Sequence, residues 1–220
     1  MENTEQNETP KQDPKLTVGD EVKQFYKGDF KNIFTTVFTN PIQGIYELLE
    51  KPSEKAYKQS LILFASIFFL YFAGSYIIVG EARKYMEFSN FIKISIVPVI
   101  MMFVITCLSF VIKSLSGKPN FKNELLTGGI CGIPLGLLIP IFLVIKIMAS
   151  ERDLMRLINN PMGAGVFATL IFFYLILMLI NVFQQSLKSS GTKDAMAWYL
   201  SPAAILLAFY VTFKISKGLL

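Results

Sequence analysis

The sequence contains no histidine and few charged residues, and both absences narrow the classes of protein that it can encode. Histidine is the commonest metal ligand and the commonest general base, so its absence removes the usual metal centres and acid–base sites. Charged residues make up 17% of the chain and hydrophobic residues 53%, which lies outside the range of an ordinary soluble domain. The composition predicts an integral membrane protein without a bound metal or cofactor.

The carboxylates are unevenly distributed along the chain. Of the sixteen, ten lie before residue 55, and we place the other six in connections between apolar runs, so that no predicted span contains one. This arrangement excludes the usual intramembrane proton relays, carboxylate pairs and protease sites. A serine nucleophile would need a base, and the only candidate, Lys146, is better explained as a side chain that snorkels to the membrane surface. We therefore predict no catalytic residues and no enzymatic activity.

The lysines and the cysteines do not suggest a binding site either. The lysines flank apolar runs and do not form a stripe with interleaved aromatic residues, so we expect no nucleic-acid partner. Cys107 and Cys131 lie inside apolar runs, where a thiol behaves as a small hydrophobe. They predict neither a disulfide framework nor a metal site.

Five runs are long enough to cross a bilayer, because about twenty helical residues span a hydrocarbon core of about 30 Å. The predicted spans are residues 60–79, 94–112, 125–147, 162–183 and 195–213. Their connections are short, so residues 60–220 are expected to form one all-α transmembrane domain. The connection 148–161 is expected to make a brief amphipathic turn.

The N-terminal residues 1–22 are polar, acidic and punctuated by proline, which predicts a disordered tail. They lack the basic start and apolar core of a signal peptide, so we expect this end of the chain to be cytoplasmic. Five spans then place the C-terminus outside. Positive residues close to the spans divide evenly between the two faces and do not by themselves fix the orientation.

Residues 23–59 connect the tail to the first span and have apolar residues at helical spacing on both sides of a break at Asn40-Pro41. Such amphipathic helices lie in the membrane surface. The first is expected to begin near Asp20 and to end near Thr39. Asn40 is expected to cap the second, with Pro41 as its first residue and Gln43 completing a capping box; Ser53 is expected to cap the first span. The residues predicted to contact lipid or a partner are Phe30, Ile33, Phe34, Val37, Phe38, Pro41, Ile45 and Leu49.

The third predicted span contains a ladder of glycines at four-residue spacing, formed by Gly128, Gly132 and Gly136, and it is interrupted by two prolines. Small residues at this spacing let another helix approach closely. Packing within one five-helix bundle is the simpler interpretation, and a pore or a dimerisation face is the alternative. Asn181, near the end of the fourth span, is interpreted as a helix-to-helix hydrogen bond.

The order of these parts resembles the Yip family of integral membrane proteins (Ypt/Rab-interacting proteins). The resemblance rests on the segment TNPIQGIYELLEKP before the first span, GKPNFKNELLTGGICGIPL leading into the third, and SLKSSGTKDAMAWYLSP leading into the fifth. It implies five spans and a cytoplasmic N-terminus. Eukaryotic members share an Asp-Leu-Tyr-Gly-Pro segment and work with Rab-type GTPases. This chain lacks that segment, so it is more similar to prokaryotic members, and no Rab-type partner is expected.

The functional hypothesis is a non-enzymatic protein of a bacterial cytoplasmic membrane that organises lipid or recruits partners through its surface helices. The bundle would serve as an anchor, and the expected partners are the bilayer, other copies of the chain and other membrane proteins. A role as an assembly factor for a membrane complex belongs to the same class. The alternative from a different class is a small-solute transporter or channel built on the glycine-rich third span.

Overall fold

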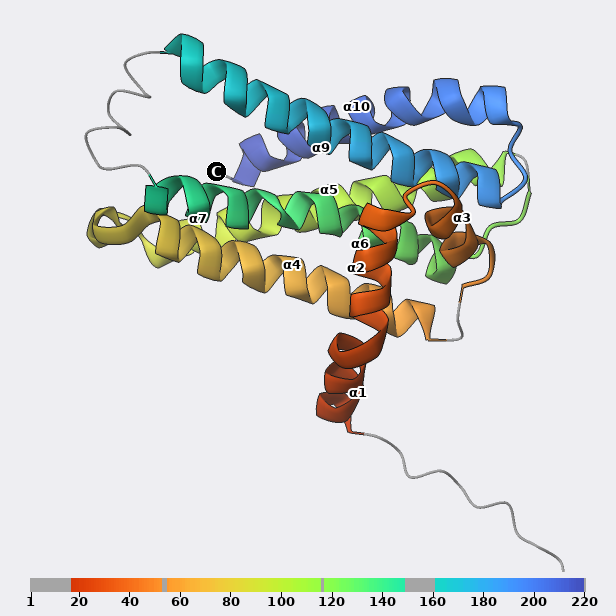
Figure 1. The fold of residues 1–220 in the computed structure, drawn as a ribbon, viewed down its shortest axis with the longest axis horizontal. Coiled ribbons are helices and arrows are strands. Elements are labelled where there is room, and N and C mark those ends of the chain that lie inside the picture. The colour runs from red at the N-terminus through yellow and green to blue at the C-terminus, as the bar shows by residue number, and fades with distance from the viewer. Residues whose placement is uncertain (1–16, 53–54, 116, 149–160, 220) are drawn as a thin grey trace, which may run out of the picture.

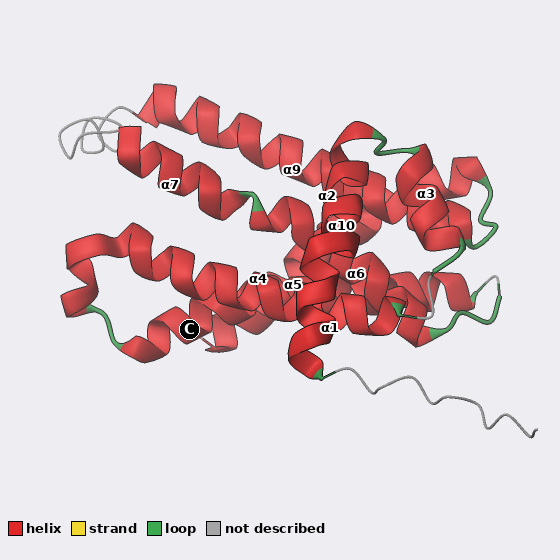
Figure 2. Cartoon of the chain, turned by 60° about the horizontal axis from the view of Figure 1, so that its bottom comes forward, coloured by secondary structure: helices red, strands yellow, loops and turns green. Residues whose placement is uncertain are grey.

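The computed structural model is all-α and describes residues 17–52, 55–115, 117–148 and 161–219 (Figures 1 and 2). Short helices come first: α1 (Val18–Gln24), the π-helix η1 (Phe25–Asp29), α2 (Phe30–Thr39) and α3 (Gln43–Glu50). Longer helices follow: α4 (Ala56–Val79), α5 (Phe88–Ser114), α6 (Phe121–Gly136), α7 (Leu138–Met148), α9 (Pro161–Ser189) and α10 (Asp194–Leu219), with a 3-10 turn η2 (Gly80–Tyr85) after α4.

Five stretches of helix within the described residues are long and apolar enough to cross a membrane. They are Ala56–Val79, Phe88–Ser114, Phe121–Ile147, Thr169–Ser189 and Asp194–Gly218. They run along the long axis of the molecule (Figure 1). The prediction of an all-α protein with five spans, preceded by shorter helices, is confirmed.

The third span is kinked. α6 ends at Gly136 and α7 begins two residues later, because Pro140 has no N–H to donate to the Gly136 carbonyl. The hydroxyl of Tyr71 on α4 donates a hydrogen bond of 2.7 Å to the carbonyl of Leu135. A neighbouring span therefore satisfies a backbone group at the place where the helix is interrupted.

α6 lies at the centre of the bundle. Every residue from Glu124 to Gly136 is buried, and α6 packs against α4, α5 and α9. Without a hydrophobic driving force between helices in lipid, close packing of such side chains holds the spans together. The core includes fully buried residues from several spans, among them Leu63, Met102, Ile105, Ile130, Leu179, Phe183 and Ile205.

The first three helical segments form one continuous rod, here called the N-terminal rod (residues 18–39). The rod runs across the spans near the start of α4, and α1 extends beyond the edge of the bundle (Figures 1 and 2). Thr17 caps its start by accepting a hydrogen bond of 3.3 Å from the Asp20 amide. The rod begins at Val18, inside the stretch predicted as a tail, and ends at Thr39 as expected.

The predicted capping box at the break between α2 and α3 is wrong. α3 begins at Gln43 and has no side-chain cap, and the Gln43 amide nitrogen donates forward to Glu47 at 2.8 Å instead of back to Asn40. An amide paired with a carboxylate one turn later is a favourable helix contact. The Asn40 carbonyl instead accepts a hydrogen bond of 3.1 Å from the Gly44 amide. Residues 1–16, the predicted cap at Ser53 and most of the connection 148–161 lie outside the described residues.

Candidate functional site

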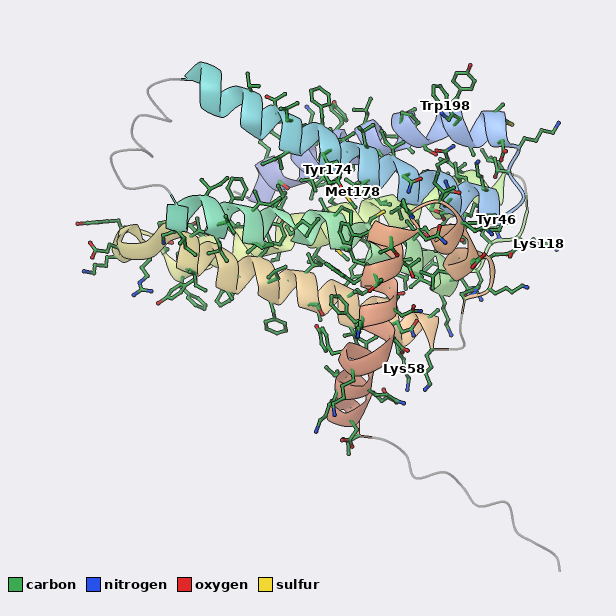
Figure 3. The ribbon with its side chains drawn as sticks, in the orientation of Figure 1. Tyr46, Lys58, Lys118, Tyr174, Met178 and Trp198 are labelled. Carbon is green, nitrogen blue, oxygen red and sulfur yellow. The ribbon has the colours of Figure 1, made fainter. Side chains whose placement is uncertain are left out.

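Polar side chains hold the N-terminal rod against the start of α4. Asp29 accepts a hydrogen bond of 2.8 Å from the amide of Gln59, and Glu21 forms an ion pair with Lys58. Figure 3 labels Lys58 at this end of α4, beside the rod. About two turns further along α4, the hydroxyl of Ser66 is hydrogen-bonded to that of Tyr26. The rod is therefore fixed to the first span by three side-chain contacts.

Four aromatic rings follow one another along the rod at four-residue spacing, and we call them the aromatic row: Tyr26, Phe30, Phe34 and Phe38. Successive ring centroids lie 5.4, 5.8 and 4.8 Å apart. Residues four apart share a helix face, which places the rings side by side. Tyr26 is 43% and Phe34 is 38% exposed, so the row has an uncovered edge outside the protein.

The structure divides the predicted contact residues into two sets. Ile33, Val37 and Ile45 are buried in the protein core, with exposures of 4%, 1% and 0%. Phe34 and Pro41 are exposed, whereas Phe30, Phe38 and Leu49 are half-buried. The apolar periodicity thus identifies a helix face that protein covers only in part. The sequence could not separate the two sets, because spacing alone does not distinguish a protein neighbour from lipid.

The break between α2 and α3 is fixed to the fourth span. The side-chain amide of Asn181 on α9 donates a hydrogen bond of 2.7 Å to the carbonyl of Pro41, and Gln185 donates to the Asn181 side-chain oxygen at 3.2 Å. α3 packs on the same helix. Asn181 was expected to bond another span, but it bonds the loop between the surface helices.

On α3, the hydroxyl of Tyr46 donates a hydrogen bond of 2.9 Å to the carboxylate of Glu50 (Tyr46 is labelled in Figure 3). This bond holds the phenol in its protonated form, so the pKa of Tyr46 is raised, with lesser contributions from burial and from the Glu50 charge. Both residues are on the outer side of α3 and reinforce a two-turn helix.

A charged pair is buried inside the bundle, and here the sequence analysis was wrong. Lys113 lies in the last turn of α5 and Glu124 in the first turns of α6, and each is 5% exposed. Both had been assigned to a connection outside the spans. The Lys113 ammonium lies 3.0 and 2.8 Å from the two carboxylate oxygens of Glu124. Because the opposite charges compensate each other, the two helices continue past the ends of the apolar runs.

Hydroxyl groups from three helices complete this buried charged cluster. Ser109 donates to Glu124 at 2.6 Å, and the Lys113 ammonium donates to the Ser186 hydroxyl on α9 at 2.8 Å. The hydroxyl of Thr127 is 2.8 Å from that of Ser186. A buried pair of charges with such additional hydrogen bonds is electrically neutral and joins α5, α6 and α9. One signal could have revealed it: Asn120 is a good N-cap, and it places Glu124 inside the helix that follows.

The glycine ladder faces the neighbouring spans of the same chain. A Cβ atom at Gly128 would lie 2.2 Å from the Thr106 hydroxyl oxygen and 2.5 Å from the Met102 carbonyl oxygen. A Cβ at Gly132 would lie 2.7 Å from the Met102 methyl group, and one at Gly136 would lie 2.9 Å from Ile67. The glycines therefore let α6 approach α4 and α5 closely, and packing within the bundle accounts for them.

Two further groups occupy the ends of the spans. The Lys146 ammonium donates to the carbonyl of Ile77 near the C-terminus of α4, where helix carbonyls lack partners and a cation is favoured. Trp198 at the start of α10 is 61% exposed and points away from the bundle, as Figure 3 shows. In the described part of the chain, no three His, Cys, Asp or Glu residues are grouped to hold a metal ion.

These features define a class of protein, a multi-pass helical membrane protein with surface helices fixed across its spans. No family model, curated protein or solved structure matches the chain. Its function has to be inferred from its own surfaces and contacts.

Proposed function

We propose that this protein organises one leaflet of the bilayer, and recruits partners there, through the N-terminal rod and α3. The observation that carries this proposal is the aromatic row on a rod that lies across the spans. A helix in this orientation runs along the membrane surface when the spans cross it. Tyr26 and Phe34 then contact lipid at the boundary between headgroups and acyl chains.

The contacts of the rod support this role. Because Ile33 and Val37 are buried in the protein, the rod does not depend on lipid to hold its position. Asp29 and Tyr26 fix it to α4, and the Pro41 carbonyl is bonded to α9. An aromatic edge held at a fixed depth expands one leaflet relative to the other, which couples the protein to lipid packing and curvature.

The test is a single substitution at the exposed edge, Phe34→Asp, with Thr35→Asp on the polar face of the same helix as its matched control. Val37 is unsuitable because it is 1% exposed, so a charge there would unfold the rod. The measurement is the sorting of reconstituted protein between small, highly curved vesicles and large ones. We expect Phe34→Asp to lose most of the preference for curved vesicles and Thr35→Asp to keep it. Equal sorting of Phe34→Asp and the unmodified protein would overturn the proposal.

We further propose that the chain is a non-enzymatic, prokaryotic-type relative of the Yip family, in a bacterial cytoplasmic membrane, without a Rab-type partner. The Asn40-Pro41 break leading into the first span and the five closely spaced spans support this assignment. The N-terminus is then cytoplasmic and the C-terminus outside. A reporter fused after Leu220 that is active only in the cytoplasm would contradict this orientation.

The buried charged cluster favours a second candidate function, a small-solute transporter or channel. Ionisable residues inside spans often mark the paths of ions and solutes. This candidate predicts a solute flux in proteoliposomes that Glu124→Gln abolishes. Replacement of Gly132 by a large residue would not test it, because a side chain there collides with Met102 and disrupts packing. We place the leaflet role first because the charges of Lys113 and Glu124 already satisfy each other.

A further inference from the structure

A small cavity of about 60 Å³ lies where the N-terminal rod meets the start of α4. Charged residues of both signs line it, Glu21 and Asp29 from the rod and Lys55 and Lys58 from the entry of α4. Two carboxylates thus face two ammonium groups. A ligand that carries one positive and one negative group matches this arrangement better than a ligand with a net charge.

The cavity also has an apolar part. Phe25, which is buried, and Ile62, which is half-buried, also line it, together with the side chains of Gln24 and Gln59. Ile62 lies just inside the uncharged run that begins at Ser60, whereas Lys55 and Lys58 precede that run. The cavity therefore lies at the boundary between the headgroup layer and the hydrocarbon core when α4 crosses the membrane.

The contacts already present leave acceptor capacity in the cavity. Asp29 accepts from Gln59 through Oδ2, and Glu21 pairs with Lys58 through Oε1. A carboxylate has about four acceptor positions on two oxygens, so each of these side chains can accept further hydrogen bonds. An ammonium group has three N–H donors for these carboxylate oxygens, and the oxygens of a phosphate group can accept hydrogen bonds from the lysines.

We propose that this cavity binds the headgroup of a phospholipid with a primary ammonium beside its phosphate, the phosphatidylethanolamine class. The ammonium donates to Asp29 and Glu21, the phosphate accepts from Lys55 and Lys58, and the glycerol end lies along Ile62. A choline headgroup carries three methyl groups in place of the N–H donors, so it cannot make these hydrogen bonds.

This inference rests on the proposed function only in requiring the rod to lie in the membrane surface. It is tested with the full chain in nanodiscs that contain equal amounts of phosphatidylethanolamine, phosphatidylcholine and phosphatidylglycerol with identical acyl chains. Native mass spectrometry counts the lipids that the protein retains. We expect the protein to retain about tenfold more phosphatidylethanolamine than phosphatidylcholine, because losing a hydrogen bond to a charged group lowers affinity by about this factor.

Two conservative variants locate the site. Asp29→Asn removes the charge that attracts the ammonium and should reduce the enrichment about tenfold, to near parity. Lys55→Gln removes one that attracts the phosphate, which all three lipids carry, so it should lower the retention of each lipid and leave their ratio unchanged. Glu47→Gln and Lys51→Gln, at α3 and its end, are the matched controls and should keep both the retention and the ratio. Circular dichroism and thermal unfolding verify that each variant is folded, and Glu21→Gln replaces Asp29→Asn if that variant is not.

Three outcomes would overturn the inference. These are equal retention of the three lipids by the unmodified protein, stronger retention of phosphatidylglycerol, and unchanged enrichment in folded Asp29→Asn or its replacement. Soluble glycerophosphoethanolamine is tested as a separate ligand. If the protein in detergent bound this compound as strongly as it binds the lipid, the ligand would be a free metabolite and not a lipid. Phe34→Asp, which tests the leaflet role, lies outside the cavity and should retain the lipid, so the two proposals can fail separately.

Discussion

The ammonium of Lys113 and the carboxylate of Glu124 face each other inside the bundle, with Nζ–Oε distances of 3.0 and 2.8 Å. The two residues belong to successive antiparallel spans, so the pair joins the loop-proximal ends of α5 and α6. Through Ser186 it also contacts α9, which follows much later in the chain. Three of the spans are therefore fixed relative to one another by one set of hydrogen bonds.

Removal of one charge from this cluster should be costly. Lys113→Met leaves the Glu124 carboxylate buried without its counter-charge, and we expect a loss of about 3 kcal/mol in the free energy of unfolding. The double variant Lys113→Met/Glu124→Met removes both charges and should recover most of that loss. Reversible unfolding in detergent micelles measures both. A double variant as unstable as the single one would show that the hydroxyl network, not charge compensation, dominates.

Gly128 should not tolerate a methyl group. Gly128→Ala brings a Cβ within 2.5 Å of the Met102 backbone carbonyl, which cannot move without shifting α5, so we expect about 2 kcal/mol of destabilisation. Gly28→Ala is the matched control, since a Cβ there meets no atom within 4 Å. Thermal unfolding of the two variants should separate them clearly. Similar stability for both would mean that α6 can move away from α5 without cost.

Asn181 should hold the surface helices in place without holding the spans together. Asn181→Ala removes the donor to the Pro41 carbonyl, and a hydrogen bond of this kind contributes about 1 kcal/mol. We expect faster hydrogen exchange in α3, with little change in α5 and α6. Asn32→Ala, at an exposed position on α2, is the control and should leave the exchange unchanged. Unchanged exchange in both variants would show that side-chain packing alone fixes α3.

The hydroxyl of Tyr71 should contribute to the stability of the bundle. Tyr71→Phe removes the side-chain donor to the Leu135 carbonyl at the kink of the third span, and we expect about 1 kcal/mol of destabilisation. In Tyr76→Phe the ring contacts with Arg83 and Phe91 survive, so that variant should be neutral. Unfolding of the two variants under the same conditions makes the comparison. A neutral Tyr71→Phe would mean that the kink satisfies its carbonyls in another way.

The main features of the fold follow from short stretches of sequence. Uncharged runs of about twenty residues predict spans by length alone. The apolar spacing around Phe30 and Phe34 predicts a helix with a defined face, and the end of that helix at Thr39 was correctly placed. The capping box at Gln43 failed because Glu47, one turn further along, is an equally good partner for its amide. Local rules cannot choose between two partners on opposite sides of one residue.

The charged cluster was missed for a different reason. A charge at the end of an apolar run is normally read as the end of a span, and Lys113 and Glu124 each stand at such an end. The cost of burying either charge is compensated only when the opposite charge lies beside it, and that opposite charge comes from another helix. Similarly, the spacing of Ile33 and Val37 identifies an apolar face, but only the position of the rod against the bundle determines that protein covers it.

The sequence by itself determined the class of protein, because hydrophobic length and the absence of charge are properties of each run alone. It also determined the helical character of the surface segment. The tertiary structure decided which ionisable groups are inside, which apolar faces meet protein and which meet lipid, and where charged residues of both signs enclose a cavity. These depend on contacts between residues far apart in the chain, such as Asn181 with Pro41 and Lys113 with Ser186.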